Sequence, residues 1–122
     1  MGLDQYAYVV DSDYVVDNFT FNGDVSNETW YWRKSRHLQG WMQNLYNRKG
    51  GPDASFNCSY VRLTKEDLEQ LKIDASSLPA VSGFFWGNSE LDEDEIANYC
   101  KFADEAIGYI NDGYAIYYSS WY

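Results

Sequence analysis

The chain of 122 residues has the length of a single domain, and its 45% hydrophobic residues suffice for one core. A formal net charge of −10 disfavours direct binding to nucleic acid, because phosphate backbones would be repelled. No apolar run reaches the roughly 18 residues of a membrane helix, and the two cysteines without a signal peptide indicate a reducing cytoplasm.

The first half of the chain predicts strands followed by one helix. Alternating side chains at 6–10 and an extended run at 14–21 predict a strand pair or one long bent strand. The aromatic segment 29–32 predicts a short strand. Apolar residues at the spacing of one helical face predict a helix near 34–48, ended by two glycines and a proline. The residues of that face are Leu38, Trp41, Met42 and Leu45.

The next part of the chain predicts two strands around a short helix. Residues 56–63 resemble a strand, and Thr64 predicts the N-cap of a helix that ends before Leu78. The apolar run 81–87 is bounded by glycines, which predicts a buried strand.

A long helix and a last strand complete the predicted domain. Asp92 as N-cap and Glu95 as capping-box acid predict where the helix starts, and Gly113 predicts its end. Residues 114–121 predict the final strand. Because strands and helices do not alternate regularly, the fold class is α+β, a single domain over 1–122 with an antiparallel sheet and about three helices. The predicted core stripe of the long helix is Ile96, Tyr99, Cys100, Ala103, Ile107 and Ile110.

Several short blocks, in order along most of the chain, resemble a family of small phage and prophage proteins. The blocks are MGLDQY at 1–6, YWRK at 31–34, FNC at 56–58, LTKEDL at 63–68, SGFFWG at 82–87 and YYSSW at 117–121. The family's usual histidine ahead of the helical tryptophan is replaced by Gln39, and His37 lies two positions earlier. The resemblance implies a phage-borne accessory protein in the cytoplasm of a bacterial host, and it brings no biochemical activity.

The segment 30–34 is the densest candidate for a ligand site. Aromatic faces beside cations can stack a base and hold its phosphate, so Trp30, Tyr31 and Trp32 with Arg33 and Lys34 suit a nucleotide. The alternative is structural, because alternate residues of a strand face opposite sides, so that one set packs inside.

The acids at 90–95 are the densest candidate for a protein contact. Residues 66–122 hold twelve acids and two bases, and a field of this sign would attract Lys- and Arg-lined grooves. The alternative is a solvated helix start that matches the helix dipole. The candidate residues are Glu90, Asp92, Glu93, Asp94 and Glu95.

His37, Cys58 and Cys100 are the only His and Cys residues, and together with a carboxylate they form a candidate zinc site. Cys100 falls on the predicted apolar stripe and is expected to be a buried structural thiol. His37 and Cys58 are therefore the candidate metal ligands. No third group is signalled to orient a nucleophile and base, so we do not expect an enzyme.

Three hypotheses follow for the function. The leading one is an acidic, phage-encoded binding protein that inhibits a host defence nuclease complex, by analogy with anti-CRISPR proteins. It would dock on a basic surface, for instance of a Cas9-type effector, and block nucleic-acid loading without touching nucleic acid or membrane. The alternatives are a protein that sequesters a nucleotide signal at 30–34 and a small metal-binding structural protein.

Overall fold

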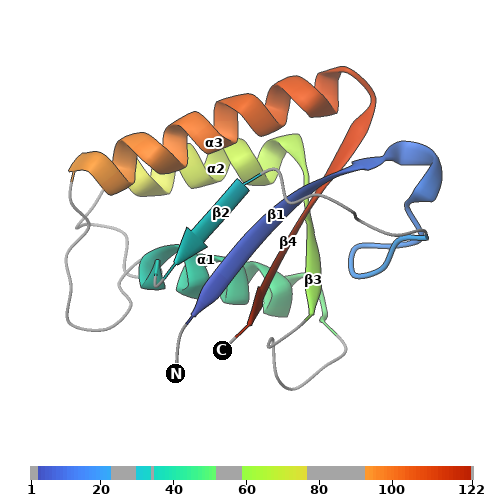
Figure 1. Cartoon of the computed structure of the whole chain (residues 1–122), viewed down its shortest axis with the longest axis horizontal. Helices are drawn as coiled ribbons and strands as arrows, with labels where there is room; N and C mark the ends of the chain where they lie inside the picture. Colours follow the sequence, from blue (N-terminus) through green and yellow to red (C-terminus); the bar gives the residue numbers. More distant parts are fainter. Residues whose placement is uncertain (1–2, 23–29, 34, 52–58, 77–92, 122) are drawn as a thin grey trace.

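The computed structural model of the protein describes residues 3–22, 30–33, 35–51, 59–76 and 93–121 (Figure 1). These residues form one small α+β domain with a four-stranded antiparallel sheet and three helices, which confirms the predicted fold class. The elements are β1 (Asp4–Asp11), the short 3-10 helix η1 (Ser12–Tyr14), β2 (Trp30–Arg33), α1 (Arg36–Arg48), β3 (Tyr60–Leu63), α2 (Lys65–Ser76), α3 (Glu93–Asn111) and β4 (Tyr114–Trp121).

The sheet has the strand order β2-β1-β4-β3, and each strand is antiparallel to its neighbours. The first and last strands are therefore the central pair, with Asp4 opposite Trp121 and Asp11 opposite Tyr114. Figure 1 shows the N and C marks close together at one end of this pair. The short strands β2 and β3 form the two edges.

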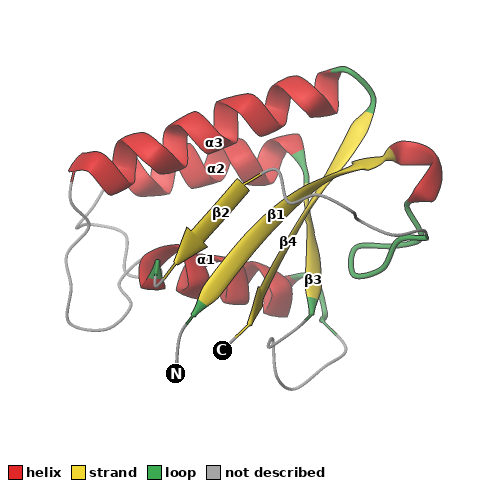
Figure 2. Cartoon of the chain, viewed as in Figure 1, coloured by secondary structure: helices red, strands yellow, loops and turns green. Residues whose placement is uncertain are grey.

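All three helices pack on one face of the sheet (Figure 2). Side chains from the helices and from this face form one buried cluster, in which each large apolar side chain contributes about 1.5–3 kcal/mol. The sheet supplies Ala7, Trp32, Val61, Leu63, Ile116 and Tyr118 to the cluster. The prediction of an apolar face on α1 is confirmed, because Leu38, Trp41, Met42 and Leu45 are all buried there.

A polar network lies inside this core where β1, β4 and the start of α1 meet. Gln5 is fully buried, and its Nε2 donates to the Ser35 carbonyl and to the Tyr118 hydroxyl, each at 2.9 Å. Its Oε1 accepts the Ser35 N–H at 2.8 Å. The Tyr118 hydroxyl donates to Gln39 Oε1 at 2.6 Å. Since buried polar groups need partners, these bonds fix the start of α1 against the central strands.

The opposite face of the sheet is aromatic, and no helix among the described residues covers it. The Tyr6 ring lies 5.3 Å from the Tyr31 ring, measured between centroids. Phe21, from the segment after η1, packs 4.7 Å from the Tyr117 ring and so covers part of this surface. We call the surface the tyrosine face, and its residues are Tyr6, Tyr8, Tyr31, Tyr60, Tyr117 and Trp121.

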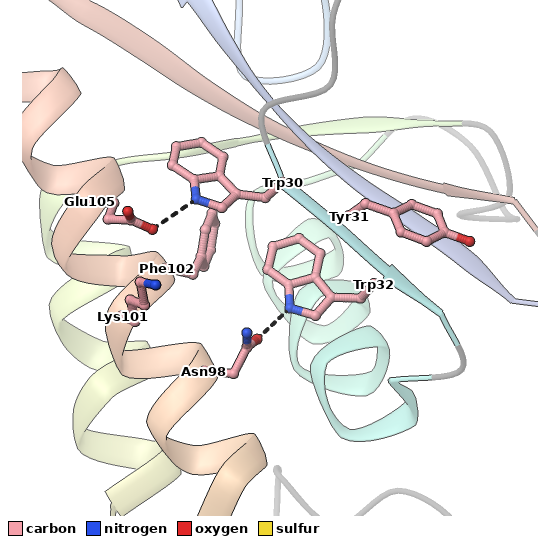
Figure 3. Close-up of a pocket in the computed structure, with 7 residues that line it drawn as sticks. All are labelled: Trp30, Tyr31, Trp32, Asn98, Lys101, Phe102 and Glu105. Carbon is pink, nitrogen blue, oxygen red and sulfur yellow. Dashed lines mark hydrogen bonds between the residues drawn. The ribbon is translucent and has the colours of Figure 1, made fainter.

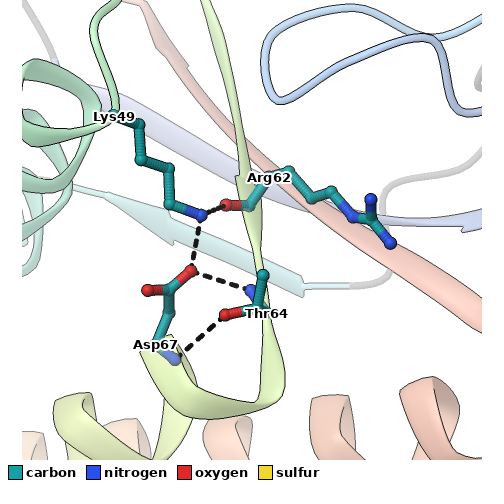
Figure 4. A network of polar contacts seen from close by, with 4 residues as sticks. All are labelled: Lys49, Arg62, Thr64 and Asp67. Atoms are coloured by element: carbon teal, nitrogen blue, oxygen red, sulfur yellow. Dashed lines mark hydrogen bonds and ion pairs between the residues drawn. The ribbon is translucent and has the colours of Figure 1, made fainter.

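The end of α1 and the start of α2 meet in a polar junction (Figure 4). Thr64 is the predicted N-cap, because its Oγ1 accepts the Asp67 N–H at 3.2 Å while Asp67 Oδ2 accepts the Thr64 N–H at 2.9 Å. Lys49 Nζ donates to Asp67 Oδ2 at 2.5 Å and to the Arg62 carbonyl at 2.6 Å. One lysine therefore ties α1, β3 and α2 together.

The strand prediction for 14–21 is wrong. After β1 the chain turns through η1, and only Val15 and Phe21 form an isolated bridge. The cause is a local turn, in which Asp17 Oδ1 accepts the N–H groups of Phe19 and Thr20, each at 2.8 Å. The strand predicted at 81–87 lies outside the described residues.

The core stripe predicted for α3 is correct only in part. The buried residues of this helix are Tyr99, Phe102, Ala103 and Ala106, while Cys100 is only half-buried. Phe102, which the prediction left out, is buried and contacts Trp30 and Trp32 of β2. The helix ends at Gly113 as predicted, where a φ of 98° suits glycine.

Candidate functional site

Strand β2 contains the predicted aromatic and basic block, and strand alternation divides the block between two faces. Trp30 and Trp32 face the helices, whereas Tyr31 and Arg33 face the other side of the sheet. The Tyr31 hydroxyl donates to Asp4 Oδ1 at 2.7 Å, and this bond raises the pKa of Tyr31.

The two cations of the block do not complete a nucleotide site with the indoles. Arg33 lies opposite Asp4 in the sheet, on the face away from Trp30 and Trp32. Lys34 lies outside the described residues. The expectation that 30–34 act as one site is therefore corrected, since the strand separates Arg33 from the tryptophans.

A pocket of about 150 Å³ lies between β2 and α3 (Figure 3). Trp30 Nε1 donates to Glu105 Oε1 at 3.2 Å, and Trp32 Nε1 donates to Asn98 Oδ1 at 2.6 Å. Phe102 meets both indoles edge-on, with centroids 4.9 Å from each. In Figure 3 both indoles point toward α3 and the Tyr31 ring points away. The lining residues are Trp30, Tyr31, Trp32, Asn98, Lys101, Phe102 and Glu105.

The pocket offers aromatic surface, acceptor oxygens on Glu105 and Asn98, and donor N–H groups on Lys101 and on the Asn98 amide. Both indole N–H groups already have acceptors, and the side chains that accept them belong to Asn98 and Glu105. Lys101 and Glu105, both exposed, bring one positive and one negative charge to the lining. Because small-molecule sites measure roughly 300–1,000 Å³, a pocket of about 150 Å³ suits one side chain better than a whole nucleotide.

The predicted acidic patch is partly described and lies at the start of α3. Glu93 and Asp94 are exposed, whereas Glu95 is half-buried and accepts a long 3.5 Å bond from the Tyr99 hydroxyl. Burial raises the pKa of Tyr99, which keeps this hydroxyl neutral. The other two predicted residues, Glu90 and Asp92, lie outside the described residues.

The described part of the acidic patch and one wall of the aromatic pocket lie on the same helix, α3. Asp94 lies one turn before Asn98, and Lys101 and Glu105 continue the same side of α3. In the sequence the two features are separate candidates, because residues 30–34 and 90–95 are far apart along the chain. Packing of α3 on β2 makes them neighbours.

Helices α2 and α3 form an acidic pair. Together they hold nine acids and three bases, whereas α1 holds two arginines and no acid. Lys72 Nζ bonds Asp104 Oδ1 at 2.6 Å across the pair, and this bond raises the pKa of Lys72. Six of the nine acids are exposed on this pair, and they are Glu66, Glu69, Glu93, Asp94, Asp104 and Glu105.

The structure describes only one of the two candidate zinc ligands. His37 is buried in α1, and Cys58 lies outside the described residues. Within the described residues, no group of three or more His, Cys, Asp or Glu side chains is placed to hold a metal ion.

Sequence reasoning misses Asn98, Phe102 and Glu105 as members of the site. A signal was present, because these residues and Lys101 follow the i, i+3, i+4, i+7 spacing of one helix side. It also misses the tyrosine face, although Tyr6 and Tyr8 alternate in sequence. The helical spacing does not show which strand packs against α3. The alternation of Tyr6 and Tyr8 does not show which strands lie beside theirs in the sheet.

In the described part of the chain, no helix has the length and apolar character needed to cross a membrane. Comparisons with protein-family models, with curated proteins and with solved structures found no match to this chain.

Proposed function

We propose that this protein is an acidic binding protein that docks through α3 on a Lys- and Arg-lined surface of another protein. The observation that carries the proposal is the stripe on α3, where exposed Glu93 and Asp94 lead into a pocket walled by Trp30 and Trp32. Stable interfaces combine aromatic anchors with complementary charge, and this stripe offers both.

The resemblance to phage and prophage proteins suggests the partner. A host defence nuclease complex, such as a Cas9-type effector, holds nucleic acid in a positively charged channel. An acidic protein that occupies this channel would block nucleic-acid loading and act as an inhibitor without catalysis. The net charge of −10 would also speed association by steering.

The test measures the association rate of the purified protein with a Cas9-type effector at several salt concentrations. We expect the double variant E93Q/D94N to associate several-fold more slowly than the parent, with a weaker salt dependence, because rim charges act mainly on association. The matched control is D13N/D112N, which removes the same charge at two exposed positions away from the stripe.

The outcomes are distinct once circular dichroism shows that all variants are folded. If the control variant associates as the parent does and E93Q/D94N is slowed, the stripe is the contact. If both variants lose the same modest amount, only the overall charge acts. If E93Q/D94N matches the parent in rate and salt dependence, docking through α3 is wrong.

A further inference from the structure

We infer that the pocket between β2 and α3 receives a single arginine side chain from the partner. The inference rests on the proposed function and names the anchor of that interface. Binding energy at interfaces concentrates in a few side chains that fill pockets, and arginine is one of the commonest. A pocket of about 150 Å³ has the size for such an anchor.

The hydrogen-bonding groups of the wall match a guanidinium. Arginine has five N–H donors and no acceptor, so it needs acceptors and ring faces. The indole donors of Trp30 and Trp32 are already used on Glu105 and Asn98, which leaves the carboxylate and the amide oxygen facing the site as acceptors. Apart from Lys101, the other lining residues are aromatic, and tryptophan is the best ring partner for a cation.

An anionic ligand such as a nucleotide phosphate fits the same wall poorly. The lining contains one cation, Lys101, and the carboxylate of Glu105 opposes it. Arg33, which would add positive charge, lies on the other side of the sheet. The exposed side chain of Lys101 competes with an entering guanidinium instead. Removal of the Lys101 charge should therefore favour a bound cation and disfavour a bound anion. Removal of the Glu105 charge should have the reverse effects.

The test is a titration of the whole protein that is followed by NMR of the indole N–H signals, which Trp30→Phe and Trp32→Phe assign. The probe is N-acetyl-arginine amide, which we expect to shift both signals with a Kd on the order of 10 mM. N-acetyl-citrulline amide is the matched control, because it has the same shape without the charge. AMP is the anionic probe.

Three variants test whether the pocket prefers a cation or an anion. E105Q keeps an oxygen that accepts from Trp30 and loses only the negative charge, so we expect it to weaken arginine binding about threefold. K101Q should strengthen binding by a similar factor, because a competing cation is removed. D112N removes an exposed acid outside the lining and should leave the Kd unchanged.

The result that supports the inference is a shift by the arginine probe, little or none by citrulline, and opposite effects of E105Q and K101Q. Equal shifts by the citrulline probe, or tighter binding of AMP that K101Q abolishes, would overturn it. So would the lack of any shift by about 50 mM probe. The titration contains no partner, so it can fail while E93Q/D94N still slows association, and the proposed docking through α3 then survives.

Discussion

Tyr99 shows how one buried hydroxyl connects α3 to the core. Its side chain is 1% exposed, and its hydroxyl lies 2.5 Å from Ser35 Oγ at the start of α1. Burial is the main cause that raises its pKa, and the nearby Glu95 carboxylate acts in the same direction. The folded protein therefore holds this proton at a pH where the unfolded chain releases it.

The resulting stability depends on pH with a defined sign. Because the folded pKa lies above the unfolded value of about 10, stability is complete below pH 10 and falls as the pH rises further, by up to about 1.4 kcal/mol per unit for one proton. Urea unfolding between pH 9 and 11 measures the slope. Tyr99→Phe should make the slope shallower, whereas exposed Tyr14→Phe should not. Parallel curves for parent and Tyr99→Phe would contradict this explanation.

At the scale of elements, the junction in Figure 4 decides how α1 and α2 are held. Asp67 acts twice, since it caps α2 through Thr64 and pairs with Lys49. The side chains of Lys49 and Asp67 are 14% and 18% exposed, so solvent screens this pair less than an open surface pair.

Removal of the Asp67 carboxylate should therefore destabilise the fold. We expect Asp67→Ala to lower the free energy of unfolding by about 2 kcal/mol, because a cap is lost and the Lys49 ammonium keeps only the Arg62 carbonyl as a partner. Glu69→Ala, an exposed acid on the same helix, is the control and should change it by less than about 0.5 kcal/mol. Chemical denaturation measures both, and equal effects would show that the junction does not stabilise the protein.

Element prediction from the sequence succeeds where the pattern is local. The helix at α1 follows from its apolar spacing and from the glycines after it, and Gly50 indeed has a φ of 83°. The strand prediction at 14–21 is wrong because a turn forms there. The Asp17 carboxylate stabilises this turn by accepting hydrogen bonds from two backbone N–H groups, an interaction that the apolar pattern does not indicate. Phe102 and Ala106 are buried although the prediction left them out, because α3 contacts both α2 and β2 and so buries a wider side than one stripe.

The candidate site was only half accessible to sequence reasoning. The residue types at 30–34 and 90–95 indicate binding surfaces, yet strand alternation sends Tyr31 and Arg33 away from the tryptophans. The bonds from Trp30 to Glu105 and from Trp32 to Asn98 join residues 75 and 66 positions apart. Contacts of this kind depend on how the helix lies on the sheet, which periodicity does not specify.

At the scale of the whole molecule, the domain has two different faces that suit partners. The α3 stripe combines acids with the tryptophan pocket, and the tyrosine face lies on the opposite side of the sheet, where Trp121 is 60% exposed. We assign docking to the first face because it has both a pocket and more acids than bases. The faces carry separate tryptophans, so they can be distinguished in one experiment.

Hydroxyl-radical footprinting of the protein with and without its basic partner tests the central claim most directly. We expect oxidation of Trp30 to fall in the complex, because the pocket is then filled, and oxidation of Trp121 to stay the same. Protection of Trp121 with no change at Trp30 would contradict the account and would place the partner on the tyrosine face.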